Sequence, residues 1–120
     1  MTLVDTSAWI DHFHRPDRRL LALLDDAQVV THPLVIGEIS CGHLRNREET
    51  LEVLHDQPAV DAIENAAVLE LIESRRLYGR GLSFVDAHLL ASAIRSGYHL
   101  FTADKRLSRV ATELGLQNSN

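Results

Sequence analysis

Three short apolar segments alternate with longer segments of helical periodicity along this 120-residue chain. The short segments span residues 3–5, 29–31 and 99–102, and each is long enough only for a short strand. Short strands separated by helices favour a parallel sheet, because parallel strands need a crossover to return to the same edge. The pattern therefore predicts an α/β fold whose parallel sheet is covered by helices on both faces, with right-handed crossovers.

The segments between the strands carry start and stop signals of helices. Pro33 falls in a first helical turn, where its missing N–H costs nothing. Ser83 is a strong N-cap residue, and Gly97 ends the helix that follows it. Helices are predicted at residues 7–14, 19–27, 33–41, 48–54, 62–77, 84–96 and 105–114, with room for a further strand near Leu116.

Length and composition describe one ordinary globular domain. Apolar residues make up 45% of the chain and charged residues 24%, which excludes the compositions of disordered and membrane-spanning proteins. We assign residues 1–116 to a single domain and residues 117–120 to a C-terminal tail that should fray. The single cysteine, Cys41, excludes an intramolecular disulfide. This cysteine content fits a reducing cytoplasm best. The first predicted strand begins almost at Met1 and leaves no space for a signal peptide.

Four acidic residues are expected at one end of this fold. Asp5 and Asp104 lie at the carboxyl ends of predicted strands, where open α/β sheets bind ligands. Glu38 and Asp86 lie on predicted helices and are expected to face inward. Glu38 shares a helical face with Leu34, Val35 and Cys41, and Asp86 heads an apolar stripe of Leu89, Leu90 and Ala93.

Helix capping offers a simpler explanation for these acids taken one at a time. Ser83 and Asp86 have the spacing of a capping box, and Asp104 directly precedes a predicted helix. Thr6 or Ser7 can cap the first helix, which leaves the Asp5 carboxylate without a structural role. Capping thus explains the residues separately, whereas a shared site explains their common location.

A cluster of these four carboxylates would require a cation. Two unit charges about 5 Å apart repel by roughly 3 kcal/mol at an effective dielectric constant of 20. Carboxylate oxygens without His or Cys partners favour Mg²⁺ or Mn²⁺ over zinc. Ions of this kind bind phosphate oxygens and lower the pKa of a bound water. Hydrolysis of a phosphodiester is the natural use of such a site.

The formal charge of −5 argues weakly against a nucleic-acid partner. Eleven of the twelve basic residues are nevertheless arginine, whose planar fork binds phosphate in a bidentate manner. These arginines are grouped along the chain, either as solvated helix faces or as phosphate contacts. The candidates for substrate binding are Arg15, Arg18, Arg80 and Arg106.

The chain resembles the PIN-domain ribonucleases, and among them the VapC-type toxins of bacterial toxin–antitoxin pairs. The resemblance covers nearly the whole chain and is carried by residues 4–10, 36–39, 84–91 and 102–104. It implies a three-layer α/β/α sandwich with a short parallel sheet. It also implies a Mg²⁺-dependent or Mn²⁺-dependent endoribonuclease, a cognate VapB-type antitoxin that inhibits it, and a homodimer.

The resemblance also implies roles for individual residues. Asp5 and Asp86 would be the primary metal ligands, and Asp104 and Glu38 would complete the catalytic acidic pocket, bind a second ion or orient water. Hydrogen bonds to these carboxylates would come from Thr6, Ser7 and Thr102. His88 and Leu90 depart from the smaller or purely aliphatic residues common in relatives, which puts the local packing in doubt.

Two rival functions remain open at this point. One is a non-catalytic α/β binding module whose acids only cap helices. The other is a haloacid-type phosphatase, which needs a second acid two positions after the first, where this chain has Ser7. The seven histidines show no zinc-binding spacing and are expected to be surface or half-buried imidazoles.

Overall fold

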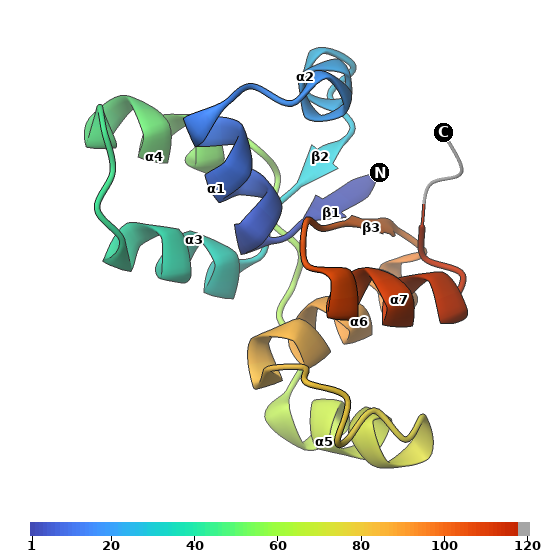
Figure 1. The fold of residues 1–120 in the computed structure, drawn as a ribbon. Helices are drawn as coiled ribbons and strands as arrows, with labels where there is room; N and C mark the ends of the chain where they lie inside the picture. Colours follow the sequence, from blue (N-terminus) through green and yellow to red (C-terminus); the bar gives the residue numbers. More distant parts are fainter. Residues whose placement is uncertain (118–120) are drawn as a thin grey trace.

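The structure is a computed structural model, and it describes residues 1–117. Its centre is a parallel sheet of the strands β1 (Thr2–Val4), β2 (Val29–Val30) and β3 (His99–Phe101). The strand order is β2-β1-β3, with Leu3 of the central strand paired to Val30 on one side and Leu100 on the other (Figure 1). The predicted α/β class with a short parallel sheet is confirmed.

Seven helices connect and cover these strands within residues 1–117, close to their predicted positions. They are α1 (Thr6–His14), α2 (Arg18–Asp25), α3 (Pro33–Cys41), α4 (Arg47–His55), α5 (Asn65–Ser74), α6 (Phe84–Ser96) and α7 (Lys105–Glu113). Helices α1, α3 and α4 gather on one side of the sheet, and α5, α6 and α7 gather on the other (Figure 1). None of the helices in this part of the chain is long and apolar enough to cross a lipid bilayer.

Helix α5 is shorter than the predicted 62–77 at both ends. Residues 61–64 before it form no helix, with a ψ of 143° at Glu64, and Ala59 forms an isolated parallel bridge with Thr31. After it, Arg76 adopts a positive φ of 54°, which a continuing helix cannot include. Leu116 forms no strand within the described residues, although its carbonyl accepts a 2.8 Å hydrogen bond from Leu100 N–H.

Helix α6 is the most buried helix, because it lies between the sheet and α5. Its residues from Ala87 to Ala93 are all buried, and the predicted stripe of Leu89, Leu90 and Ala93 belongs to the main core. A second, smaller core between α5 and α6 contains Val68 and Ala87. A helix that is buried on all sides is fixed in position, and it therefore also fixes the residues at its N-terminus.

The carboxyl ends of the strands lie at one end of the sheet, because the strands are parallel. Helix α1 begins directly after β1, α7 begins shortly after β3, and α3 begins shortly after β2. The segment after α7 was expected to fray from Gln117 onward. Gln117 itself donates hydrogen bonds to the hydroxyl and carbonyl oxygens of Ser108, and the rest of that tail lies outside the described residues.

Candidate active site

Asp5 lies at the carboxyl end of the central strand and is only 4% exposed. Its Oδ1 atom accepts hydrogen bonds from Ala8 N–H at 3.0 Å and from the Ser7 hydroxyl at 2.8 Å. Its Oδ2 atom accepts one from the Thr102 hydroxyl at 2.7 Å, which connects β1 to the end of β3. The carboxylate is therefore held in one orientation by three donors.

The expectation that Thr6 or Ser7 caps α1 is wrong, because Asp5 is the N-cap residue. Asp5 has the extended backbone that an N-cap requires, with φ −82° and ψ 172°. Thr6 is already the first helical residue, so its side chain is not placed to cap the helix. Asp5 thus has a structural role that sequence reasoning missed, although an acid directly before a helix was the available signal.

Burial is the main influence on the Asp5 carboxyl and raises its pKa above 3.8. The hydrogen bonds from Ala8, Thr102 and Ser7 act in the opposite direction and lower the pKa. The negative charge of Asp86 adds to the increase. The Asp86 carboxylate is therefore near enough to act on Asp5 through its charge.

Asp86 forms the capping box that the sequence suggested at the start of α6. Ser83 N–H donates to Asp86 Oδ2 at 2.9 Å, and Asp86 N–H donates to Ser83 Oγ at 3.0 Å. Burial raises the pKa of the Asp86 carboxyl, the Ser83 hydrogen bonds lower it, and the charges of Asp104 and Glu38 raise it further. Asp86 Oδ1 accepts no hydrogen bond from residues 1–117, so one of its oxygens is left for another partner.

Glu38 is exposed, which corrects the prediction that it faces inward. Helix α3 buries Val35 and Ile39, whereas Glu38 and Cys41 point to solvent, so the predicted apolar face was assigned wrongly. The Glu38 side chain is nevertheless directed by a hydrogen bond from the Thr6 hydroxyl to its Oε1 atom at 2.6 Å. That contact places the glutamate beside the start of α1.

Asp104 is exposed and is the N-cap residue of α7. Its Oδ1 atom accepts hydrogen bonds from the N–H groups of Arg106 at 2.8 Å and Leu107 at 3.2 Å. Its own N–H donates to Thr102 Oγ1 at 3.0 Å. Thr102 therefore contacts both Asp5 and Asp104, and it sets the distance between the ends of β1 and β3.

Charge effects connect Asp86 with each of the other three carboxylates, but the four side chains do not form one tight cluster. Asp86 acts on Asp5, and both Asp104 and Glu38 act on Asp86. Within residues 1–117, however, no three His, Cys, Asp or Glu side chains are close enough together to hold one metal ion. Repulsion between like charges favours such a separation when no cation lies between them.

The donor set nevertheless fits a hard divalent cation. All four side chains offer carboxylate oxygens, which are the ligands that Mg²⁺ and Mn²⁺ prefer. Asp86 Oδ1 is free of hydrogen bonds from the described residues, and the pKa values of Asp5 and Asp86 are raised partly by neighbouring negative charge. A cation would offset this repulsion and bring the oxygens closer together.

The arginines predicted to bind phosphate differ in their availability. Arg80 donates hydrogen bonds from Nη1 and Nη2 to the two carboxylate oxygens of Glu113, at 2.6 and 2.8 Å, so its fork is occupied. The Arg106 side chain lies across Gly81. Arg15 and Arg18 are exposed, and neither forms a salt bridge with any residue in the 1–117 range.

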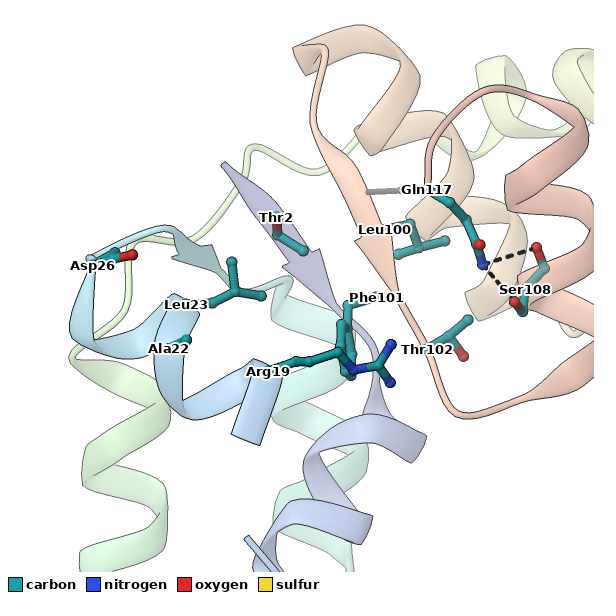
Figure 2. A pocket seen from close by; sticks show the side chains of 10 residues that line it. All are labelled: Thr2, Arg19, Ala22, Leu23, Asp26, Leu100, Phe101, Thr102, Ser108 and Gln117. Carbon is teal, nitrogen blue, oxygen red and sulfur yellow. Dashed lines mark hydrogen bonds between the residues drawn. The ribbon is translucent and has the colours of Figure 1, made fainter. Parts of the chain in front are cut away.

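Arg19 is an additional candidate that the sequence did not single out. Its guanidinium carbon lies 4.9 Å from the centroid of the Phe101 ring, a cation–π distance. Both side chains line a cavity of about 440 Å³ (Figure 2). No local signal could have revealed this pair, because the two residues come from α2 and β3. The cavity is also lined by Thr2, Ala22, Leu23, Asp26, Leu100, Thr102, Ser108 and Gln117.

Comparisons with known proteins agree with this architecture. The family model for the PIN domain matches residues 2–113. The chain is 44% identical over 117 residues to Ribonuclease VapC32 of Mycobacterium tuberculosis, covering 97% of this chain and 94% of that protein.

Solved structures with similar folds include PAE2754 from Pyrobaculum aerophilum and VapC20 from Mycobacterium tuberculosis, described as a sarcin-ricin loop cleaving toxin. The TM-scores are 0.60 and 0.62, with sequence identities of 21% and 23%. The first alignment covers 97% of this chain and 96% of the other, and the second covers 92% and 95%. At these identities the structures show similarity of fold alone.

Proposed function

Because this chain belongs to the PIN-domain family, we propose that it is a VapC-type ribonuclease toxin that hydrolyses RNA with the help of a divalent metal ion. The similarity to Ribonuclease VapC32 over almost the whole length of both chains supports the reaction class. The observation that carries the site assignment is the set of hydrogen bonds at the carboxyl end of the sheet, where Thr102 joins Asp5 to Asp104 and Thr6 directs Glu38. The Asp86 charge acts on Asp5 at the same place.

In this proposal, Asp5, Asp86 and Asp104 hold the ion, and Glu38 completes the acidic pocket or orients the attacking water. Three donors fix the Asp5 carboxylate, Ser83 fixes one oxygen of Asp86, and Thr6 directs Glu38. When bound, Mg²⁺ or Mn²⁺ supplies positive charge at the reacting phosphate and lowers the pKa of water. The water oxygen would bond to phosphorus as the bond between phosphorus and the leaving ribose oxygen breaks; the water would lose one proton to the solvent and the leaving oxygen would gain one.

The proposal extends to partners by family similarity. A cognate VapB-type antitoxin would bind this chain and inhibit it, the chain would act as a homodimer, and both proteins would be cytoplasmic. Purification with a co-expressed product of the neighbouring gene, followed by light scattering, tests the first two statements. A monomer that binds no such product would contradict them.

The direct test is incubation of the purified protein with total RNA. We expect cleavage with Mg²⁺ or Mn²⁺, no cleavage in excess chelator, and recovery when the metal is restored. Asp86→Asn should abolish cleavage, whereas Asp56→Asn, which removes the same charge from an exposed residue at the end of α4, should retain it. Cleavage that persists in chelator would contradict the metal mechanism.

A second candidate is the non-catalytic binding module, and one observation favours it. Asp5, Asp86 and Asp104 each accept hydrogen bonds from backbone N–H groups at the start of a helix, as that alternative requires. The binding-module alternative predicts that Asp86→Asn lowers the melting temperature of the metal-free protein and leaves the action of the protein on RNA unchanged. The ribonuclease proposal predicts loss of cleavage with an equal or higher melting temperature, because the substitution relieves repulsion.

A further inference from the structure

The cavity of about 440 Å³ between α2, β3 and α7 shares a residue with the acidic site (Figure 2). Thr102 lines the cavity and also donates its hydroxyl hydrogen to Asp5 Oδ2 at 2.7 Å. A molecule in the cavity would therefore lie next to the residue that orients a candidate metal ligand. The volume falls within the usual range for pockets that bind small ligands.

The cavity contains a positively charged surface formed by Arg19 and Phe101. The Arg19 guanidinium lies over the Phe101 ring with its carbon 4.9 Å from the ring centroid. Arg19 is exposed and forms no salt bridge with any of residues 1–117, so its outer face and N–H groups are free. The Phe101 ring is half-buried and lies against the guanidinium.

The rest of the lining supplies polar groups at the two ends of this surface. Figure 2 shows Arg19 and Phe101 between Asp26 on one side and Thr102 on the other. Ala22 and Leu23 of α2 contribute apolar contacts. A carboxylate such as Asp26 accepts hydrogen bonds from the amino groups of bases, and it would repel a phosphate. In the proposed function the cleaved phosphate lies at the acidic site, where the metal ion would offset the carboxylate charge, so the phosphate is expected toward Thr102 and the base toward Asp26.

We propose that this cavity binds the base of a single-stranded ribonucleotide that flanks the cleaved phosphate, with the base stacked on the Arg19 guanidinium. Guanidinium planes and aromatic rings are the usual stacking partners of unpaired RNA bases. The inference rests on the proposed function and adds a substrate-recognition subsite to it. Arg19 is thereby distinguished from the other exposed arginines, because only its guanidinium, among those of residues 1–117, lies over an aromatic ring.

A binding assay that needs no cleavage tests the subsite. The probes are fluorescein-labelled RNA octamers of mixed sequence and octamers of the same charge with abasic riboses, measured by fluorescence anisotropy in chelator at low ionic strength. We expect the unmodified protein to prefer the base-bearing octamer about tenfold, which lies within the usual range for one stacked base. Arg19→Lys keeps the positive charge but removes the planar guanidinium group, so it should abolish this preference.

Matched variants separate stacking from charge. Arg19→Gln and Arg45→Gln remove the same charge from exposed residues, and only the first should reduce the preference. Phe101→Leu should act like Arg19→Lys, and circular dichroism checks that each variant is folded. An equal preference in the unmodified protein and Arg19→Lys, or an equal loss in Arg45→Gln, would overturn the subsite.

The cleavage assay is read separately, so the two proposals can fail independently. Cleavage of total RNA by the unmodified protein with an unchanged KM in Arg19→Lys would reject the subsite and retain the ribonuclease. A base preference that depends on Arg19 without any cleavage would reject the ribonuclease and retain the subsite. If Arg19→Lys weakens binding of a co-purified antitoxin and leaves RNA binding unchanged, the cavity is a protein-docking site and the RNA assignment is wrong.

Discussion

Asp5, Asp86 and Asp104 each use a carboxylate oxygen to satisfy backbone N–H groups at the start of a helix. Capping and metal binding are compatible, because a carboxylate has two oxygens and several lone pairs. The capping bonds fix the orientation of each side chain, which lowers the entropy that a bound ion would otherwise have to remove. The same residues can therefore stabilise the helices and form the candidate site.

Two substitutions of Asp5 separate its capping role from its charge. Asp5→Ala removes the acceptor for Ala8 N–H and should lower the free energy of unfolding by about 1–2 kcal/mol. Asp5→Asn keeps an acceptor and removes a charge that burial disfavours, so metal-free stability at pH 7 should be equal or higher. Urea denaturation in chelator measures both values. Equal destabilisation by the two variants would mean that the charge itself stabilises the fold.

His32 is fully buried and has a structural role, and His88 is also buried, so the prediction that the histidines are surface or half-buried is wrong for these two residues. The Nδ1 atom of His32 accepts a 3.0 Å hydrogen bond from Leu34 N–H and caps α3, so the neutral ring carries its hydrogen on Nε2. Burial first, and the nearby ring of His88 second, lower the pKa of His32 from 6.5 to about 4. The centroids of these two rings are 6.0 Å apart. Protonation of Nδ1 would break the hydrogen bond that caps α3 and would place a positive charge in the core.

The lowered pKa predicts an acid-sensitive fold. The unfolded chain takes up a proton at His32 near pH 6.5 and the folded chain only near pH 4, so stability falls as the pH decreases through that window. The loss of unfolding free energy caused by protonation of His32 approaches about 3 kcal/mol. His32→Asn keeps an N-cap acceptor and cannot be protonated in this range. The difference in unfolding free energy between the two proteins should therefore shrink from pH 7 to pH 4, whereas parallel curves would contradict the assignment.

At the scale of elements, two contacts connect the loop before α6 to helix α7. The Arg80–Glu113 ion pair is bidentate but exposed, so its contribution to stability is small. The second contact is the Arg106 side chain packed across Gly81, which has a φ of +78°. Because this loop leads into Ser83 and Asp86, the contact with α7 helps to set the position of Asp86 relative to Asp104.

Gly81→Ala tests this contact, with Gly79→Ala as a matched control. Both glycines have positive φ, so each substitution costs about 1–2 kcal/mol of backbone strain. A Cβ atom at Gly79 meets nothing within 4 Å, whereas one at Gly81 comes within 2.7 Å of Arg106 Cδ. Gly81→Ala should therefore also displace Arg106 and reduce RNA cleavage, which Gly79→Ala should not. Thermal melting and cleavage rates measure the two effects, and equal cleavage in both variants would exclude a positioning role.

The helices were predictable because their signals are local. Pro33 in a first turn, the Ser83 capping box and Gly97 with its positive φ all act within a few residues. The Thr31–Ala59 bridge was missed, because it joins segments that no local pattern relates. The four acids stay candidates from the sequence, and the exposure of Glu38 was not predictable because it depends on which face of α3 meets the core. The Arg19–Phe101 pair likewise depends on tertiary packing.

At the scale of the whole molecule, the chain has a formal charge of −5 and gathers negative charge at one end of the sheet. The helices α1, α3 and α7 begin at that same end. Helix N-termini carry partial positive charge, which offsets part of the repulsion between the acids. Burial is the main cause of the raised pKa of Asp86, and the negative charges of Asp104 and Glu38 raise it further. The metal-free fold is therefore less stable at neutral pH than the same fold with the Asp5 and Asp86 carboxyl groups neutral.

Mg²⁺ should accordingly stabilise the whole protein, even without RNA. An ion present at about ten times its Kd stabilises a fold by roughly 1.4 kcal/mol, which is several degrees in melting temperature for a domain of this size. Sodium chloride at the same ionic strength controls for screening and should give a smaller shift. Asp86→Asn should lose most of the stabilisation by Mg²⁺, because the substitution removes the carboxylate that interacts with the other three. Asp56→Asn should keep the stabilisation by Mg²⁺. A shift of the same size in Asp86→Asn would mean that Mg²⁺ acts on the surface charge in general, and the assignment of these carboxylates as metal ligands would then be wrong.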